Sequence, residues 1–159
     1  PENIYKRGWM SANLTQNSGD FGGMSKNNDT ANDYVYAVLS ANFTAAAFND
    51  VVVNFDTVKK SLRKRFVNGV YTCPWDGVFT VKGNLFVTGG GGFAKVVVNG
   101  VDYGGYFTLN KETQYGSYNC GFDADVICKQ GDKIELHICT TTDASIAANQ
   151  SSYLTVTAK

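Results

Sequence analysis

The stretch Lys95-Val96-Val97-Val98-Asn99-Gly100-Val101-Asp102-Tyr103 consists of two short, mostly apolar segments joined by an Asn-Gly pair. Such a pair is the strongest short-range signal for a β-hairpin, because Asn and Gly both accept the positive φ angles of a type I′ turn. Segments of the same kind follow one another from Tyr34 to the C-terminus, separated by Gly, Asn and Asp. The sequence therefore predicts an antiparallel all-β domain of about eight to ten short strands.

The other expected strands are apolar or alternating runs of similar length. They cover residues 34–43, 51–55, 69–72, 78–87, 117–128, 133–141 and 151–158. Residues 126–128 and 134–139 flank the turn Lys129–Asp132, which predicts that these two segments pair as a hairpin. The basic run between residues 58 and 66 is compatible with one helical turn, but its flanks favour a loop. A β-sandwich or jelly roll is therefore the expected fold.

The composition agrees with one folded domain and excludes several classes of protein. A chain of 159 residues has the length of one domain, and 43% hydrophobic residues with 18% charged ones argue against intrinsic disorder. The 14 Lys and Arg balance the 14 Asp and Glu, whereas a generic nucleic-acid-binding protein carries a basic excess. No apolar run approaches the roughly 20 residues that span a bilayer.

Residues 1–33 differ from the rest of the chain. They contain several Asn residues and two Gly-rich spots, and their periodicity is weak. We expect a stem over residues 1–33 that leads into a knob domain over residues 34–159. The chain begins at Pro1 rather than Met, which predicts an excised domain whose preceding part carries any targeting signal.

The four cysteines are Cys73, Cys120, Cys128 and Cys139. In the hairpin expected around residues 129–132, Cys128 and Cys139 would lie about 20 Å apart, whereas a disulfide needs Cα atoms within about 7 Å. We therefore expect buried, reduced thiols, with Cys120–Cys139 as the alternative disulfide. There is no CxxC motif and a single histidine, so neither a metal site nor a cofactor is predicted.

No arrangement of residues predicts catalysis. His137 shares a strand face with Glu135 and Cys139, and no Gly-x-Ser-x-Gly motif accompanies it. A hydrogen-bonded structural role is expected for this histidine. Asp123 and Asp125 are two residues apart, about 6.6 Å along a strand, which is within the carboxylate spacing of inverting glycosidases. Any solvated strand face offers the same arrangement, so we predict that the protein is not an enzyme.

Two neighbouring segments are candidates for receptor contact. Gly89–Gly92 predicts a flexible loop at one end of the domain. Residues 102–121 are rich in Tyr, Asn and Gly, a composition that suits adaptable contacts and the faces of sugar rings. The alternative is that these are ordinary strand and loop residues. The receptor candidates are Gly90, Gly91, Asp102, Tyr103, Tyr106, Tyr115 and Tyr118.

A basic run provides a second kind of candidate site. It comprises Lys59, Lys60, Arg63, Lys64 and Arg65. These cations predict contact with an anionic glycan, such as lipopolysaccharide phosphates, or with acidic groups of a partner subunit. The alternative is a solvated loop balanced by nearby acidic residues. Nucleic-acid binding is disfavoured because no aromatic stacking platform is interleaved with the charges.

Several segments, in order along the chain, resemble the globular head of the complement q-subcomponent, a fold shared with tumour necrosis factor. Residues 69–81 are similar to the family signature Gly-x-Phe-x-x-Pro-x-x-Gly-x-Tyr-x-Phe, and residues 126–136 resemble its Leu-x-Leu-x-x-Gly-Asp-x-Val-x-Leu segment. Phe55–Val58, Val97–Gly100 and Ser152–Val156 match further family strands and turns. The match covers residues 34–158. It departs from the family in the closing strand, where the family's Gly is missing.

The resemblance implies a homotrimeric, antiparallel jelly roll. The sequence contains no collagen Gly-X-Y repeat, and residues 1–33 instead resemble the junctions of bacteriophage tail fibres and tail needles, several of which end in a knob of this fold. We therefore expect a phage tail knob within the virion that is joined to the rest of a fibre or needle. Its partner would be a bacterial cell-surface receptor, either a glycan or an outer-membrane protein.

Two alternatives remain open. The first is a secreted complement-like lectin or cytokine-like ligand, for which the sequons at Asn13, Asn28, Asn42 and Asn149 would be glycosylation sites. The second is a module that binds or hydrolyses glycans. Unpaired cysteines favour assembly in a reducing cytoplasm, and hence the phage protein.

Overall fold

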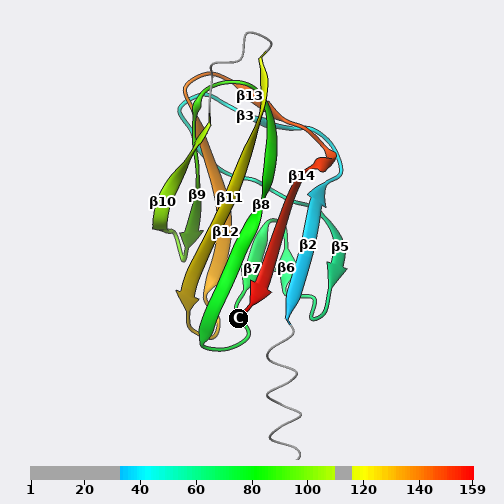
Figure 1. Cartoon of the computed structure of the whole chain (residues 1–159), viewed down its shortest axis with the longest axis vertical. Helices are drawn as coiled ribbons and strands as arrows, with labels where there is room; N and C mark the ends of the chain where they lie inside the picture. Colours follow the sequence, from blue (N-terminus) through cyan, green and yellow to red (C-terminus); the bar gives the residue numbers. More distant parts are fainter. Residues whose placement is uncertain (1–32, 110–115) are drawn as a thin grey trace, which may run out of the picture. The chain divides into compact units, whose positions relative to one another are not determined.

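Two antiparallel sheets pack against each other in this computed structural model, which describes residues 33–109 and 116–159 (Figure 1). The described residues form thirteen strands: β2 (Tyr34–Leu39), β3 (Phe43–Ala45), β4 (Asp50–Val52), β5 (Thr57–Ser61), β6 (Phe66–Val67), β7 (Val70–Thr72), β8 (Gly77–Gly89), β9 (Gly92–Val98), β10 (Val101–Leu109), β11 (Ser117–Cys128), β12 (Lys133–Thr140), β13 (Ala144–Ile146) and β14 (Asn149–Ala158). This exceeds the expected number because several strands have only two or three residues. The prediction of an all-β jelly roll is confirmed.

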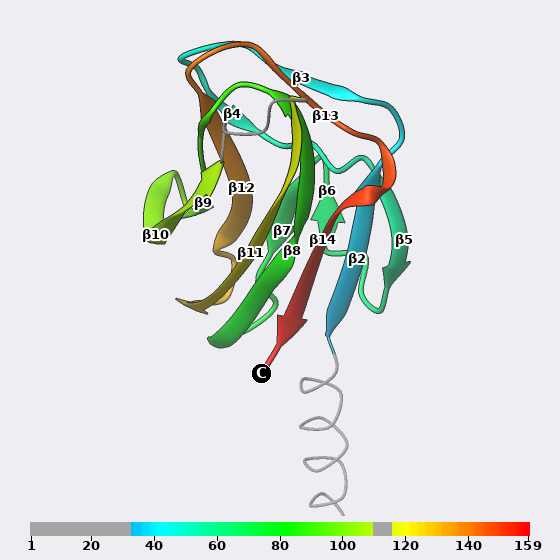
Figure 2. The same cartoon turned by 45° about the horizontal axis from the view of Figure 1, so that its top comes forward.

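The two sheets have different strand orders. The β8 sheet has the order β3-β13-β8-β14-β2-β5, and β11 pairs with the other edge of β8. The β9 sheet has the order β10-β9-β12-β7-β6, and β4 pairs with β12. Figure 2 shows the sheets as two layers, with β8, β14 and β2 in one layer and β9 and β12 in the other. Each layer therefore has one inner face and one outer face.

Alternating apolar residues build the core between these layers. On β8, every second residue from Phe79 to Val87 is fully buried. On β12, Ile134, Leu136 and Ile138 point inward in the same way. Full burial of a side chain of this size stabilises the fold by about 1.5–3 kcal/mol. Because successive residues point to opposite faces, the same pattern fixes which residues of each strand point outward.

The Asn99-Gly100 hairpin is confirmed. Val98 pairs with Val101, and both turn residues have the positive φ angles of a type I′ turn, 52° and 81°. The Asn99 amide also donates a 2.8 Å hydrogen bond to Asp132. The hairpin is thus fixed both by its own sequence and by the turn that precedes β12.

The hairpin expected around residues 129–132 is wrong. β11 pairs with β8, whereas β12 pairs with β9, β7 and β4, so the turn carries the chain from one sheet to the other. Cys73 holds this turn at the end of β7, because its N–H donates to the carbonyl of Asp132 and its carbonyl accepts from the N–H of Gly131. A Gly-Asp turn can connect two strands of a hairpin or two strands of different sheets. Which of the two forms depends on the distant strands with which the flanking segments pair.

None of the four cysteines forms a disulfide, and Cys73, Cys120 and Cys128 are buried as expected. The alternative Cys120–Cys139 disulfide rested on the wrong hairpin. Cys120 lies on β11 beside β8, and Cys139 lies on β12 beside β9, so the two belong to different sheets. Burial raises the pKa of the Cys120 thiol to about 11, which keeps it protonated at neutral pH.

Two expected loops have regular or buried structure. The basic run 58–66 contains strand β5, which pairs with β2, and the first residue of β6. Gly89–Gly92 forms a turn in which Gly90 and Gly91 are buried rather than an exposed loop. A Cβ at Gly90 would lie 2.7 Å from the carbonyl oxygen of Thr142, so packing requires glycine there.

Among the described residues the first strand, β2, starts at Tyr34 and pairs with β14, and the boundary between stem and knob stays a prediction. The predicted stem, apart from Asp33, lies outside the described residues. Tyr115 also lies outside them. The prediction of a stem over residues 1–33 therefore stays a prediction.

Candidate functional site

The outer face of the β9 sheet combines charged side chains from several strands. On β9, Ala94 and Val96 point into the core, so Lys95 between them points outward. On β12, the same alternation turns Glu135 and His137 outward. Strand register places His137 directly opposite Lys95. The sheet thereby brings together residues that lie about 40 positions apart in the sequence.

Five of these outward residues form what we call the Lys95 network: Lys95, Asp50, Asp102, Glu135 and His137. The Lys95 ammonium lies 2.9 Å from Asp50 Oδ2 and 2.8 Å from Asp102 Oδ1. Its side chain is only 11% exposed, whereas the two aspartates are about half exposed. Lys95 is thus held between two carboxylates that come from β4 and β10.

His137 occupies the structural position predicted from the sequence. Its Nδ1 lies 3.0 Å from Asp50 Oδ1 and its Nε2 lies 2.8 Å from Glu135 Oε1. Both ring nitrogens therefore have hydrogen-bond partners. This leaves neither nitrogen to act as a general base on a nucleophile.

The network changes the pKa values of its members. Hydrogen bonds to Asp102 and then to Asp50 raise the pKa of Lys95 against the opposing effect of burial. For Asp50, burial acts to raise the pKa, but the contacts with Lys95 and His137 together lower it. For Asp102, the hydrogen bond from Lys95 is the main cause of a lowered pKa. All three groups are therefore held in their charged forms.

An aromatic pair borders the network. The Tyr106 hydroxyl donates a 3.1 Å hydrogen bond to Asp102, and its ring lies 4.5 Å from that of Phe93. Tyr106 is 60% exposed. The structure thus brings the receptor candidates Asp102 and Tyr106 together. Sequence reasoning missed Lys95, although a single lysine in an apolar strand was a signal for it.

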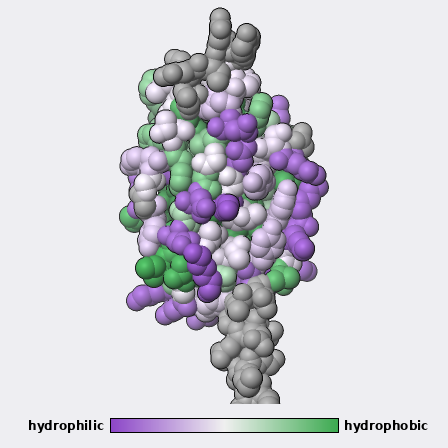
Figure 3. Space-filling model, viewed as in Figure 1, coloured by the Kyte–Doolittle hydropathy of each residue, from purple (hydrophilic) through white to green (hydrophobic). Residues whose placement is uncertain are grey.

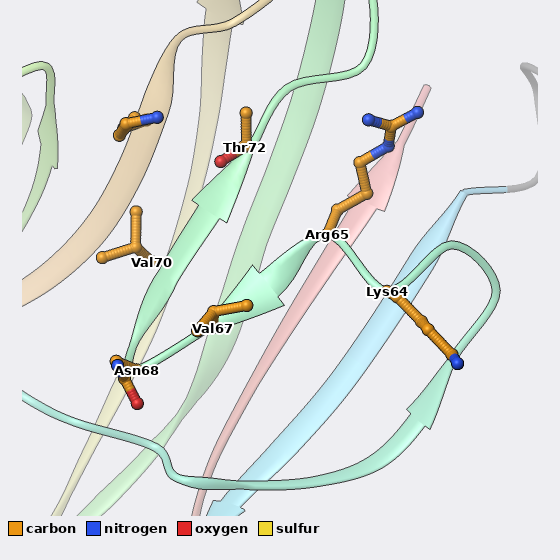
Figure 4. A pocket seen from close by; sticks show the side chains of 7 residues that line it. Lys64, Arg65, Val67, Asn68, Val70 and Thr72 are labelled. Carbon is orange, nitrogen blue, oxygen red and sulfur yellow. The ribbon is translucent and has the colours of Figure 1, made fainter.

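A hollow of about 440 Å³ lies on the same outer face, at the β6–β7 end (Figure 4). We call it the basic hollow; it is lined by Lys64, Arg65, Val67, Asn68, Val70, Thr72 and Lys133. Figure 4 shows Val67 on β6, Val70 and Thr72 on the neighbouring β7, and Asn68 at the turn between the two strands. The hollow therefore has an apolar part on β6 and β7 and three cations around it.

Strand pairing explains why these cations meet. The N–H of Thr72 donates to the carbonyl of Arg65, and Thr72 pairs with Lys133 on β12. Arg65, Thr72 and Lys133 therefore form one row across the sheet. Lys64 has a φ of 40°, and its N–H donates a 2.9 Å hydrogen bond to Ser61 Oγ. Backbone hydrogen bonds thus fix the backbone positions from which the Lys64 and Arg65 side chains extend.

The structure divides the predicted basic run. Lys64 and Arg65 line the basic hollow, where Lys133 joins them without any signal in the local sequence. Lys59 lines a separate hollow of about 490 Å³ beside β2, and Lys60 pairs opposite Tyr36 at the edge of the β8 sheet. The Arg63 guanidinium lies 5.7 Å from the centre of the Trp75 ring. The five cations are therefore not one site.

The other receptor candidates are mostly engaged in packing. Tyr118 is 9% exposed, and its hydroxyl donates to the carbonyl of Gly90. The Tyr103 hydroxyl accepts a 3.0 Å hydrogen bond from the N–H of Ile127, which links β10 to β11. Asp102 and Tyr106 remain exposed. The receptor role of these residues stays a prediction.

The outer face of the β8 sheet has a different character. Tyr36 on β2 and Tyr153 on β14 lie side by side, with ring centres 5.9 Å apart. Asp123 and Asp125 point outward as expected, but each faces a lysine, Lys82 at 3.8 Å and Lys159 at 2.6 Å. Figure 3 views this face, where weakly polar residues cover much of the surface between separate hydrophilic spots.

Neither outer face offers a metal site within residues 33–109 and 116–159, where no three His, Cys, Asp or Glu side chains group to hold an ion. The same residues include no helix capable of spanning a bilayer. The outer faces carry ion pairs and hydrogen bonds, which can take part in recognition by charge and shape.

Comparison with solved structures defines the fold as that of the complement q-subcomponent and tumour necrosis factor. The globular domain of zebrafish complement 1qA aligns with a TM-score of 0.58 and 14% identity, over 77% of this chain and 94% of that one. Eiger TNF from S. frugiperda aligns with a TM-score of 0.54 and 12% identity, over 80% of this chain and 90% of that one. Murine APRIL aligns with a TM-score of 0.55 and 9% identity, over 80% of this chain and 98% of that one. No protein-family model and no curated protein matches the sequence.

Proposed function

We propose that this chain is a non-enzymatic, homotrimeric knob at the tip of a phage tail needle or tail fibre, where it contacts the host cell surface. The outer face of the β8 sheet carries the trimer part of this proposal. Tyr36 and Tyr153 pack against each other on that face while both remain partly exposed. Thr155 on β14 and Phe86 on the neighbouring β8 are also half-buried. Subunit interfaces are enriched in aromatic residues and depleted in charge at their centres.

The phage part of the proposal is supported by the sequence. Residues 1–33 resemble fibre and needle junctions, and four cysteines without a disulfide fit assembly in a reducing cytoplasm. On this proposal the chain is part of the virion, joined to the remainder of the fibre or needle. Its partner is a glycan or an outer-membrane protein of a bacterium. Three copies on one axis would let individually weak contacts add up.

The native mass tests the trimer. Light scattering after size exclusion should give about 52 kDa, three times the 17.2 kDa of one chain. Tyr36→Glu with Tyr153→Glu should shift the protein to the monomer, because it introduces like charges at the proposed interface. Tyr106→Glu is the matched control, since it adds the same kind of charge to the other sheet. A wild-type monomer, or dissociation by both variants alike, would contradict the proposal.

Binding to cells tests the attachment role. Labelled wild-type protein should bind to susceptible bacteria and should compete with infection, whereas the monomeric Tyr36/Tyr153 variant should bind more weakly. The weakening should reach at least about tenfold, because multivalent attachment is lost. Equal binding by trimer and monomer, or no binding by either, would remove the attachment role.

A secreted ligand domain is the second candidate, favoured by the likeness to the complement 1qA and APRIL structures. It predicts glycosylation at the exposed sequon Asn42-Phe43-Thr44. A peptide map of the protein from its native source distinguishes the two candidates. An occupied Asn42 supports the secreted ligand, and an unmodified Asn42 supports the phage knob.

A further inference from the structure

We propose that the basic hollow binds a saccharide that carries a phosphate group. This proposal rests on the proposed function, because it takes the host cell surface as the source of the saccharide. The hollow lies on the outer face of the β9 sheet, and the proposed trimer contact lies on the outer face of the β8 sheet. These faces are on opposite sides of the sandwich, so the proposed contact at Tyr36 and Tyr153 does not itself cover the hollow.

The charge of the hollow points to an anion. Lys64 and Arg65 come from the segment between β5 and β6, Lys133 comes from β12, and all three line the hollow. The ion pairs resolved among the described residues do not involve any of these three. The nearest acidic residue along β12 is Glu135, whose carboxylate is bound to His137. Three positive charges match the dianionic state of a phosphate monoester, and Arg binds phosphate through two parallel hydrogen bonds.

The rest of the lining points to a sugar as the carrier of that anion. Asn68 and Thr72 supply an amide and a hydroxyl that can pair with sugar hydroxyls, and Val67 and Val70 supply an apolar patch for C–H groups. The volume of about 440 Å³ is in the range of small-molecule sites. None of the seven lining residues is aromatic, so a nucleobase finds no stacking platform.

The hollow is positioned before any ligand arrives. Pairing of β6 with β7 and of β7 with β12 sets the row Arg65, Thr72 and Lys133. The hydrogen bond from the Lys64 N–H to Ser61 Oγ fixes the backbone at Lys64, next to Arg65 in the chain. A preformed arrangement lowers the entropy lost on binding, so a small ligand can be held by few contacts.

Calorimetry on the purified full chain tests the proposal without cells. The probes are glucose 6-phosphate, glucose, glucuronic acid and inorganic phosphate. Glucose 6-phosphate should bind, glucose should not, and glucuronic acid and inorganic phosphate should each bind at least about threefold more weakly because they lack the dianion or the sugar. Inorganic phosphate binding as tightly as glucose 6-phosphate would overturn the saccharide, and no binding of any anion would overturn the site.

Matched charge variants locate the binding. Lys64→Gln with Arg65→Gln should weaken glucose 6-phosphate binding at least about tenfold. Lys59→Gln with Lys60→Gln removes the same two charges from the same run but away from the hollow, so it should change binding less than about twofold. Lys133→Gln, on a different strand, should weaken binding as well. Equal loss in both double variants would mean attraction by overall charge and would overturn the proposal.

Failure of this inference differs from failure of the proposed function. Native mass and cell attachment are measured on the same variants. If the Lys64/Arg65 variant stays trimeric and attaches to cells like wild type, the proposed knob function is supported and the hollow is not its receptor site. If wild type binds glucose 6-phosphate but is a monomer that does not bind to bacteria, the saccharide site is supported and the phage knob is contradicted.

Discussion

The two sheets share one core but present unlike outer faces. On the β8 sheet, the lysines stand apart from each other and are open to water: Lys82, paired with Asp123 at 3.8 Å, is 64% exposed. On the β9 sheet, Lys95 is 11% exposed and contacts two carboxylates within 2.9 Å. One face thus carries separate surface pairs, and the other carries a packed network.

The charged side chains of the two faces should therefore contribute differently to stability. Exposed ion pairs gain little because water and salt screen them. A nearly buried cation is held by its partners, and removing it leaves their charges uncompensated. We therefore expect the β8 face to tolerate charge substitutions as far as folding is concerned. The β9 face should tolerate them at the basic hollow but not at Lys95.

The largest effect should come from the shared core rather than from either outer face. Gly83 on β8 lies so close to β14 that a Cβ there would collide with the carbonyl oxygen of Tyr153 and lie 2.6 Å from Phe122 Cζ. Gly83→Ala should lower the free energy of unfolding by about 3 kcal/mol, because backbone atoms must move. Denaturant unfolding monitored by circular dichroism measures this change.

Gly121 on β11 is the control for that substitution. A Cβ at Gly121 would meet only the carbonyl oxygen of Gly83, at 3.9 Å, which is an ordinary contact. Gly121→Ala should change the free energy of unfolding by less than about 0.5 kcal/mol. Equal losses for Gly83→Ala and Gly121→Ala would show that the close approach of β8 and β14 is not what requires glycine.

The next largest effect tests the comparison directly. Lys95→Met keeps the apolar stem of the side chain but removes the charge between Asp50 and Asp102. The loss should be about 2 kcal/mol, below the roughly 3–5 kcal/mol of a fully buried pair because the aspartates regain water. Thermal and denaturant unfolding at neutral pH provide the measurement.

Lys82→Met is the same substitution on the opposite face. It should cost about 0.5 kcal/mol or less, since the pair with Asp123 is exposed. If both variants lose the same stability, the contrast between a packed network and surface pairs does not hold. A gain in stability for Lys95→Met would mean that burying the cation costs more than its two partners return.

The stability gap between wild type and Lys95→Met should depend on pH. The lowered pKa values of Asp50 and Asp102 contribute stability above their unfolded value of about 4, and this is lost as pH falls through the folded values. The raised pKa of Lys95 contributes stability below about 10.4, and this is lost as pH rises. The gap should therefore be flat between about pH 5 and 9 and shrink on both sides.

Urea unfolding of both proteins between pH 3 and 11 measures this gap. Because His137 and Glu135 are present in both proteins, the difference isolates the contacts of Lys95. A gap that persists unchanged at pH 3 would mean that the ion pairs of Lys95 with Asp50 and Asp102 do not carry the effect. Lys82→Met repeated over the same range should show no comparable window.

Sequence reasoning succeeded where partners are adjacent in the chain. Asn99 and Gly100 determine their turn locally, and alternation around His137 placed it correctly beside Glu135. It failed where distant pairing decides. The hairpin expected after Cys128 is instead a crossing between sheets, because β11 pairs with β8 and β12 pairs with β9.

The candidate sites show the same limit. Gly89–Gly92 could not be read as a buried turn, because the carbonyl of Thr142 that excludes a side chain at Gly90 lies far away in sequence. The basic hollow needs Lys133, which only the pairing of β7 with β12 brings beside Arg65. Composition alone could suggest an anion site in the basic run, but it could not show which of its cations meet.

The smallest effect should arise at the exposed border of the Lys95 network. Tyr106→Phe removes the 3.1 Å hydrogen bond to Asp102 and keeps the ring against Phe93. Because both partners are open to water, the loss should be at most about 0.5 kcal/mol. Tyr106→Ala also removes the ring contact and should cost about 0.5–1.5 kcal/mol more. Thermal unfolding of both variants compares the two contributions. A larger loss for Tyr106→Phe than for Lys95→Met would place the centre of the network at Asp102 instead of Lys95, and the contrast between the two faces would then rest on the wrong residue.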